Sequence, residues 1–169
     1  MNEIKVLLKK VGIFSSFPEE ELSEIAQKSK ILDMKGGDYV FKEGDVGGGF
    51  YIIVEGEVEV VKKIADDDIH ITTLRKGEMF GESDIIAPFG EKRMASVFVR
   101  NKAKLINIPK ECIENLTTKN PKLFLLFFRY IGHTILQRLR KMDEEYLKVL
   151  IEFKGKDKFL DTKIKIFKE

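Results

Sequence analysis

A run of short, alternating segments between residues 30 and 108 constrains the fold of this chain more than any other feature. Segments such as FYIIVEGEVEVVKK and HITTLRKG alternate apolar and polar residues, which is the pattern of strands with one buried face. Glycines separate the segments where the chain must turn, and ADDD at 65–68 has the composition of a hairpin tip. Many short strands joined by turns predict a mainly β fold, an antiparallel β-roll of the jelly-roll-like, double-stranded β-helix type.

A helical pattern precedes these strands. Ser16 and Glu19 have the spacing of a capping box, which predicts a helix start. The following EEELSEIAQ places Leu22, Ile25 and Ala26 on one face, so this face is expected to be buried.

A second helical region follows the strands. It starts with PKECIENL at 109–116 and continues as a long helix from Pro121, which suits a first helical turn, to about Ile151. The chain therefore divides into an N-terminal helical segment, the β-roll, the C-terminal helices and a basic tail, at residues 1–29, 30–108, 109–152 and 153–169.

The long helix carries two interleaved series of residues spaced by seven: Phe128, Ile135, Met142 and Val149, and Leu125, Gly132, Leu139, Tyr146 and Phe153. A seam of this length favours a helix that pairs with its own copy, and so predicts a homodimer. The alternative is a helix packed lengthwise on its own β-domain. The first turns, LFLLFF, are apolar nearly all round and are predicted to pack on the domain. Beyond Gln137 the helix is polar outside the seam, which favours pairing.

Charge and composition exclude several functional classes. The 169 residues carry a net charge of +2 with both signs interspersed, unlike the basic bias of most nucleic-acid binders. Two histidines and one cysteine are too few for an ordinary His/Cys metal site, so a metal-dependent enzyme on a β-roll is not expected. No apolar run is long enough to span a bilayer. The single cysteine, Cys112, suits a reducing cytoplasm and a packing role in a helix.

Residues 80–97, FGESDIIAPFGEKRMASV, join two strands by a connection longer than a plain hairpin needs. Gly81 would let a ligand approach the backbone, and the helical turn ESDIIA would point its first N–H groups toward that glycine. Arg93 supplies a charge with a planar fork that can grip two oxygens, beside the N–H groups of Met94 and Ala95. This segment, the cassette, is therefore predicted to bind an anion.

Glu82 narrows the chemistry of that anion. A carboxylate beside a phosphate is repulsive unless it has its own partner. A ribose 2′-hydroxyl is one suitable donor, and Arg93 or nearby N–H groups are others. A glycine, a helical turn, a carboxylate and an arginine together indicate a sugar phosphate and not bare phosphate.

The run GDYVFKEGDVGGGFYIIVEGEVEVVKK, followed by LRKGEMFGES and KRMASV, resembles the cyclic nucleotide-binding domain family. That family includes the catabolite activator protein, the kinase regulatory subunits and the cyclic nucleotide-gated channels. The resemblance covers about residues 10–150. It is carried by Gly-Glu after an aromatic residue, by the arginine before a small-residue strand, and by the spacing of Gly44, Gly56 and Gly77. It implies a cAMP or cGMP ligand, no further cofactor, and a last helix that covers the base and forms the dimer.

The resemblance also implies roles for single residues. Gly81 would make the close backbone contact, Glu82 would accept the ribose 2′-hydroxyl, and Arg93 would bind the cyclic phosphate. N–H groups near Ser83 and Met94 would assist. The expected ligand-binding residues are Gly81, Glu82, Ser83, Asp84, Arg93, Met94 and Ala95, with Val60, Ile71 and Leu74 along the base and Met142, Asp143 and Glu144 on the covering helix.

Three positions depart from the family pattern. Asp84 stands where members usually have a small apolar residue, and adds negative charge close to the phosphate site. It would weaken binding unless its side chain points outward. Met94 replaces the small residue that often follows the arginine, and Pro88-Phe89-Gly90 makes the cassette slightly longer than usual.

Two functions follow as hypotheses. The first is a sensory module that binds a cyclic nucleotide and acts through its last helix on an unknown partner protein. The second is a dimerising scaffold whose cassette no longer binds, which Asp84 and the longer cassette favour. The tail KGKDKFLDTKIKIFKE is too short to read DNA and is expected to be a solvated or loosely docked end, although a truncated transcription regulator would look the same.

Overall fold

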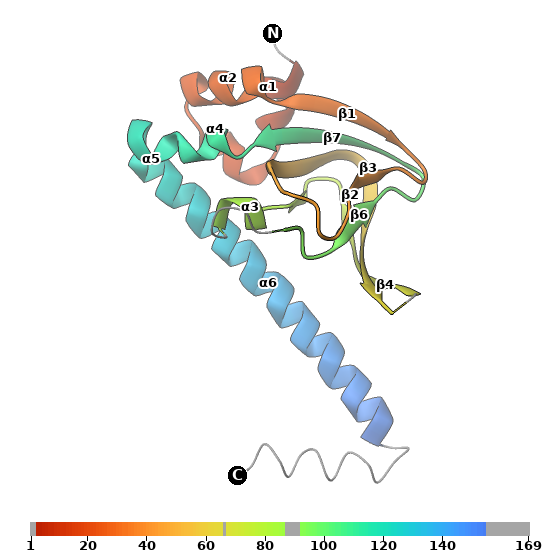
Figure 1. Cartoon of the computed structure of the whole chain (residues 1–169). Coiled ribbons are helices and arrows are strands. Elements are labelled where there is room, and N and C mark those ends of the chain that lie inside the picture. Colours follow the sequence, from red (N-terminus) through yellow and green to blue (C-terminus); the bar gives the residue numbers. More distant parts are fainter. Residues whose placement is uncertain (1–2, 66, 87–91, 155–169) are drawn as a thin grey trace. The chain divides into compact units, whose positions relative to one another are not determined.

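Seven antiparallel strands form one curled sheet in the part of the chain that the computed structural model describes, residues 3–65, 67–86 and 92–154. The chain divides into two units, Met1–Phe127 and Phe128–Glu169, and all the strands belong to the first (Figure 1). The strands are β1 Lys30–Lys35, β2 Tyr39–Phe41, β3 Gly49–Ile64, β4 Asp67–Arg75, β5 Met79–Phe80, β6 Ser96–Phe98 and β7 Lys102–Pro109. The predicted antiparallel β-roll is confirmed.

The long strand β3 makes the sheet a roll, because its two halves pair with different neighbours. Its first half pairs with β7 and β5, and its second half with β4 and β6. The register with β7 shifts between Ile53 and Glu55, and Gly56 follows with a φ of +78°. A bulge beside a glycine with positive φ bends a strand sharply, so β3 passes from one side of the roll to the other.

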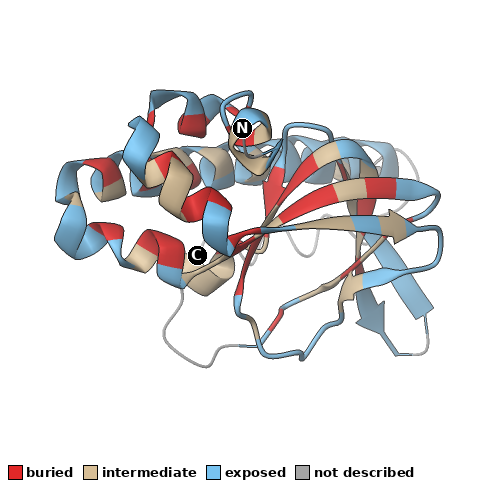
Figure 2. Ribbon diagram, turned by 90° about the horizontal axis from the view of Figure 1, so that it is seen from above, coloured by how far each residue is buried: buried red, intermediate tan, exposed pale blue. Residues whose placement is uncertain are grey.

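The roll encloses an apolar core. Its buried members come from β3, β4, β5, β6, β7 and the adjoining turns, and they include Ile53, Val58, Leu74, Phe80, Val97, Val99, Ala103 and Leu105. Buried residues, red in Figure 2, lie along the strands and alternate with more exposed ones. This alternation is the period-2 pattern that the sequence displays.

Helices lie together at one end of the roll: α1 Glu3–Leu8, the 3₁₀ turn η1 Gly12–Ser16, α2 Glu19–Lys28, α4 Glu111–Glu114 and α5 Leu116–Lys119. The inner face of α2 is Leu22, Ile25 and Ala26, as predicted. The prediction of a capping box at Ser16 and Glu19 is wrong. Ser16 ends η1, Pro18 precedes α2, and the Glu19 carboxylate instead pairs with Lys5 and Lys9, which ties α2 to the N-terminal segment.

The last helix, α6, spans Pro121–Lys154 and starts at the predicted proline. Within the first unit, Leu123 is buried, and the Phe127 ring packs against Phe14, Phe17 and Phe50. One face of the first turns therefore packs on the domain, whereas Leu125 and Leu126 are exposed.

The second unit contains the rest of α6. Seam residues on this stretch are largely exposed, among them Ile135, Leu139, Met142, Tyr146, Val149 and Phe153. No described helix is long and apolar enough to cross a membrane. The predicted tail beyond Lys154 and the insertion Pro88-Phe89-Gly90 lie outside the described residues.

Candidate functional site

The cassette begins where β5 ends, beside the first half of β3. Tyr51 on β3 pairs with Phe80 on β5, and Gly81 follows with a φ of +79°. The predicted helical turn is present as α3, Ser83–Ile86. Two backbone hydrogen bonds join residues three apart in this turn: the Asp84 N–H donates to the Gly81 carbonyl, and the Ile85 N–H donates to the Glu82 carbonyl.

Arg93 lies at the other end of the cassette, and its backbone is fixed by the β2–β3 connection. Its N–H donates to the Asp45 carbonyl at 2.8 Å, and its carbonyl accepts from the Gly44 N–H at 2.8 Å. The side chain is therefore held on a rigid frame.

The Arg93 side chain is buried, with only 5% of the residue exposed. Its Nη1 donates to the Gly81 carbonyl at 3.1 Å, and its Nη2 donates to the Gly49 carbonyl at 2.8 Å. The guanidinium carbon lies 4.1 Å from the centre of the Phe41 ring. Its Nε is buried and has no hydrogen-bond partner among the described residues. A buried cation must have an anion nearby, because burial of an unpaired charge is costly.

That anion is Asp84. Its Oδ1 lies 2.9 Å from Arg93 Nη1, and the two side chains are 7% and 4% exposed. Its Oδ2 accepts the Gly49 N–H at 3.0 Å. Gly47 leaves room for this carboxylate, because a Cβ at Gly47 would collide with it. Asp84 thus points inward to Arg93, and the outward orientation that would leave the anion site unaffected is not found.

Gly81 and Glu82 lie beside this pair. A Cβ on Gly81 would stand 2.8 Å from Arg93 Nη1, and the positive φ also favours glycine there. Glu82 is 8% exposed, so it is the second buried carboxylate of the cassette. The structure therefore brings together Gly81, Glu82, Asp84 and Arg93.

The other predicted site residues differ in burial. Ser83 and Ala95 are half-buried, while Met94 is 65% exposed and its carbonyl accepts a hydrogen bond from Lys62. Leu74 is in the core and Val60 packs against it, whereas Ile71 on β4 is 42% exposed. Met142, Asp143 and Glu144 are exposed and belong to the second unit. Their roles as ligand contacts stay predictions.

Sequence reasoning missed the aromatic partners of Arg93 on β2 and β3. Phe41 and Tyr51 line the guanidinium, and the Tyr51 ring stacks on Phe80 with centres 5.1 Å apart. Burial raises the pKa of the Tyr51 phenol, and the nearby Arg93 charge partly opposes this. The run Gly47-Gly48-Gly49 directly before FYII was the available signal, because three glycines allow close approach of other groups.

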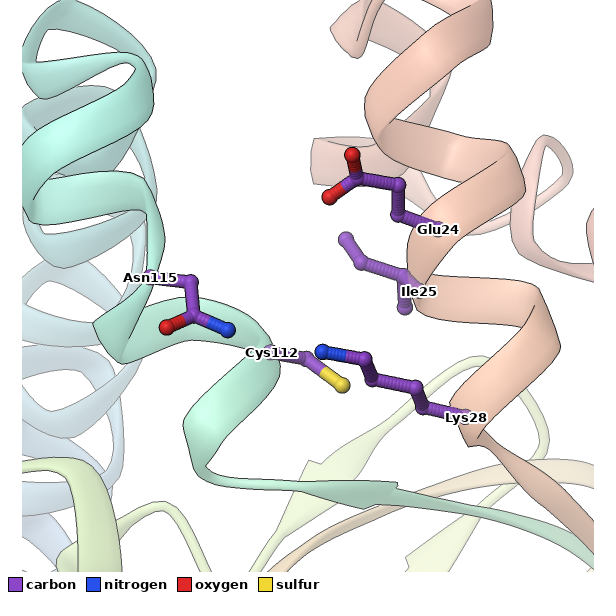
Figure 3. A pocket seen from close by; sticks show the side chains of 5 residues that line it. All are labelled: Glu24, Ile25, Lys28, Cys112 and Asn115. Carbon is purple, nitrogen blue, oxygen red and sulfur yellow. The ribbon is translucent and has the colours of Figure 1, made fainter.

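A small hollow lies away from the cassette, between α2 and α4 (Figure 3). It is lined by Glu24, Ile25, Lys28, Cys112 and Asn115, and is barely the size of one water molecule. Burial raises the pKa of the Cys112 thiol, which therefore stays protonated and unreactive. No group of three or more metal-ligating side chains occurs among residues 3–65, 67–86 and 92–154.

The geometry defines a class: a β-roll with a buried arginine, paired with an aspartate, in a short connection that contains a glycine and one helical turn. Comparison with known proteins identifies the family. The sequence profile of the cyclic nucleotide-binding domain matches residues 32–120, more than half of the chain, and includes the whole cassette. The chain belongs to the cyclic nucleotide-binding domain family, whose domain is regulatory and not catalytic.

Curated relatives carry the same domain. A cGMP-dependent protein kinase of Plasmodium berghei is 38% identical over 96 residues, which are 57% of this chain and 10% of that protein. A cAMP-dependent protein kinase regulatory subunit of Blastocladiella emersonii is 31% identical over 113 residues, 66% of this chain and 28% of that protein. A cyclic nucleotide-gated channel cone photoreceptor subunit alpha of Gallus gallus is 31% identical over 159 residues, 91% of this chain and 21% of that protein. The chain thus spans between 10% and 28% of the length of these relatives.

Solved structures share the fold. The sensor domain of a transcriptional regulator from Pseudomonas aeruginosa has a TM-score of 0.69 at 18% identity, over 80% of this chain and 91% of that one. The regulatory domain of Toxoplasma gondii PKA, crystallised with cAMP, has a TM-score of 0.58 at 20% identity, over 66% of this chain and 42% of that one. At these identities the likeness shows the β-roll fold alone.

Proposed function

We propose that this protein is a sensory module that binds cAMP or cGMP in its cassette and responds through α6. The observation that carries the proposal is the buried Arg93, which lies in the matched domain with its fork fixed by two backbone carbonyls. A buried guanidinium on a rigid frame suits an oxyanion ligand, since it recognises two oxygens at once.

The ligand contacts follow from the order of groups along the cassette. Arg93 would bind the cyclic phosphate and Glu82 would accept the ribose 2′-hydroxyl. Gly81 would let the sugar phosphate approach the backbone, because any side chain there would meet Arg93 Nη1. The base would extend along β3 and β4, toward Val60, Ile71 and Leu74.

The response would pass to a second copy of the chain and to a partner protein. Exposed seam residues on α6 support a homodimer, because a row of large apolar side chains in water favours pairing. The lone Cys112 fits a reducing compartment, and we place the protein in the cytoplasm as part of this proposal.

The binding test is calorimetric titration of cAMP and of cGMP into the full chain. Arg93→Ala should weaken binding by about 100-fold or more, because it removes two charge-assisted hydrogen bonds worth about 1.5–3 kcal/mol each. Arg93→Lys keeps the charge but loses the fork, and should weaken binding by an intermediate factor.

Arg75→Ala is the matched control, since Arg75 is exposed, pairs with Glu57 and is not among the proposed ligand contacts. Thermal melting of each variant separates lost binding from lost folding. Equal affinity of Arg93→Ala and Arg75→Ala for the nucleotide would refute the proposed phosphate contact.

One observation favours a second function, a dimerising scaffold that binds no nucleotide. Asp84 already neutralises Arg93 and lies in the place where a phosphate would add its charge. Absence of heat and of any thermal shift with either nucleotide at millimolar concentration would support the scaffold and reject the sensor.

A further inference from the structure

We infer that Asp84 is a built-in competitor of the ligand's phosphate for Arg93, and that this residue sets the affinity of the site. The inference deepens the proposed function and rests on it. It assigns Asp84 a role opposed to that of Arg93 and Glu82, since Asp84 would have to leave its present position before a nucleotide binds.

The Asp84 carboxylate has the contacts that an anionic ligand would be expected to make. One oxygen lies 2.9 Å from Arg93 Nη1, and the other accepts a backbone N–H, that of Gly49, at 3.0 Å. Both partner groups, a guanidinium and a backbone amide, are typical of phosphate sites. The carboxylate is as deeply buried as the cation it pairs with.

Charge balance makes the two anions mutually exclusive. Arg93 carries one positive charge, and Asp84 balances it inside a site that solvent hardly reaches. A cyclic phosphodiester also carries one negative charge. Holding both anions against one cation would place like charges a few ångströms apart at low dielectric, where repulsion is strong. Exchange of one for the other leaves the net charge of the site unchanged.

The element that carries Asp84 is suited to move. The helix α3 has only four residues, and a single turn contributes little stability of its own. Asp84 reaches across to the end of the β2–β3 connection, where it fits against Gly47 and accepts the N–H of Gly49, the first residue of β3. Its release would therefore separate α3 from this connection, so ligand entry and movement of α3 would be one event.

Two substitutions test the competition by different physical routes. Asp84→Asn removes the charge and nearly keeps the shape. Gly47→Ala keeps the charge but adds a Cβ that collides with the carboxylate and displaces it. Asp38→Asn is the control for the first, because Asp38 closes an exposed turn by accepting the Lys35 N–H. Gly48→Ala is the control for the second, since a Cβ there meets nothing within 4 Å.

The measurements use the full chain with cAMP and cGMP in calorimetry and with inorganic phosphate in thermal melting. We expect Asp84→Asn to bind nucleotide at least about tenfold tighter than wild type, and Gly47→Ala to bind severalfold tighter. Both controls should match wild type. Gly47→Ala should have no further effect in an Asp84→Ala background, because the displaced group is then absent. Phosphate should raise the melting temperature of Asp84→Asn but not of wild type, and Arg93→Ala should abolish that rise.

The outcomes separate this inference from the proposed function. Tighter nucleotide binding by both variants supports both. Nucleotide binding that is equal in wild type, Asp84→Asn and Gly47→Ala overturns the competition and leaves the sensor intact. An Arg93-dependent phosphate effect in Asp84→Asn, with no nucleotide binding by any variant, supports the competition and rejects the nucleotide sensor. No response to nucleotide or to phosphate in any variant overturns both.

Discussion

Two acidic side chains, Glu82 and Asp84, are two residues apart in the cassette, and both are buried. Asp84 forms a direct ion pair with Arg93, whereas Glu82 is the residue that the family resemblance assigns to a ribose hydroxyl. The two carboxylates therefore have separable tasks. Tests at the scale of single residues can address each one without the other.

The contact between Glu82 and the ribose can be tested by pairing a side-chain deletion with a ligand deletion. Wild type should bind 2′-deoxy-cAMP about tenfold or more weakly than cAMP, because the ligand loses a hydrogen bond to a charged acceptor worth about 1.5–3 kcal/mol. Glu82→Ala should bind the two ligands about equally. Glu57→Ala, an exposed glutamate that pairs with Arg75, should keep the wild-type preference. Competition titration measures the six affinities, those of each of the three proteins for both ligands.

An undiminished preference for cAMP in Glu82→Ala would mean that another group reads the 2′-hydroxyl. In that case the burial of Glu82 would need a structural explanation.

Local sequence signals predicted the positions of Gly81, Glu82 and Arg93 in one cassette, because these residues are close in the chain and the family pattern fixes their spacing. They could not predict that Asp84 faces Arg93. That orientation depends on Gly47 and Gly49, which lie more than 30 positions earlier and meet Asp84 only after the roll has formed. Sequence reasoning treated these glycines as turn residues and did not see that they make room for a carboxylate.

At the scale of elements, β3 decides the shape of the roll, and the alternation of its residues made it predictable. The bend within β3 depends on Gly56, which lies opposite Ala103 of β7 and has a positive φ. The start of α2 was predicted less well. Ser16 and Glu19 have capping-box spacing, but ion pairs from Glu19 to Lys5 and Lys9 on the preceding segment replace the cap. Tertiary contacts of this kind leave no periodic trace in the sequence.

Substitution of Gly56 separates the cost of backbone strain from the cost of a collision. Gly56→Ala should lower the free energy of unfolding by about 3 kcal/mol, because its Cβ would collide with the Lys102 carbonyl on β7 in addition to the cost of a positive φ. Gly44→Ala shares the positive φ, but its Cβ meets nothing within 4 Å, so the loss should be about 1 kcal/mol. Urea denaturation of both variants measures the difference. Equal losses would show that β7 yields and that the close approach at Gly56 does not stabilise the roll.

At the scale of the whole molecule, the feature that calls for an explanation is the heptad pattern on the part of α6 that belongs to the second unit. This part of the helix exposes large apolar side chains every three or four residues. Exposed rows of this kind usually mark a surface that another protein covers. A heptad pattern needs a partner of matching length and pattern, and a second copy of the same helix provides both. The homodimer is therefore a prediction about the second unit alone and does not depend on whether the cassette binds a nucleotide.

A matched pair of leucines on α6 tests the dimer. Leu139 belongs to the seam, whereas Leu147 lies outside it, and the two are 51% and 56% exposed in the single chain. Leu139→Asp should raise the dimer dissociation constant by about 100-fold, because the interface loses about 2–3 kcal/mol of apolar burial and would have to bury a charge. Leu147→Asp makes the same chemical change on another face and should change the constant less than about threefold. Sedimentation equilibrium measures both constants, with and without cAMP.

A wild-type chain that stays monomeric at the highest concentrations would reject the seam as an interface, and equal effects of the two substitutions would place the interface on a different face of α6. A dimer that tightens or weakens when cAMP is added would connect the two units, because ligand binding and dimerisation are linked only if each changes the free energy of the other.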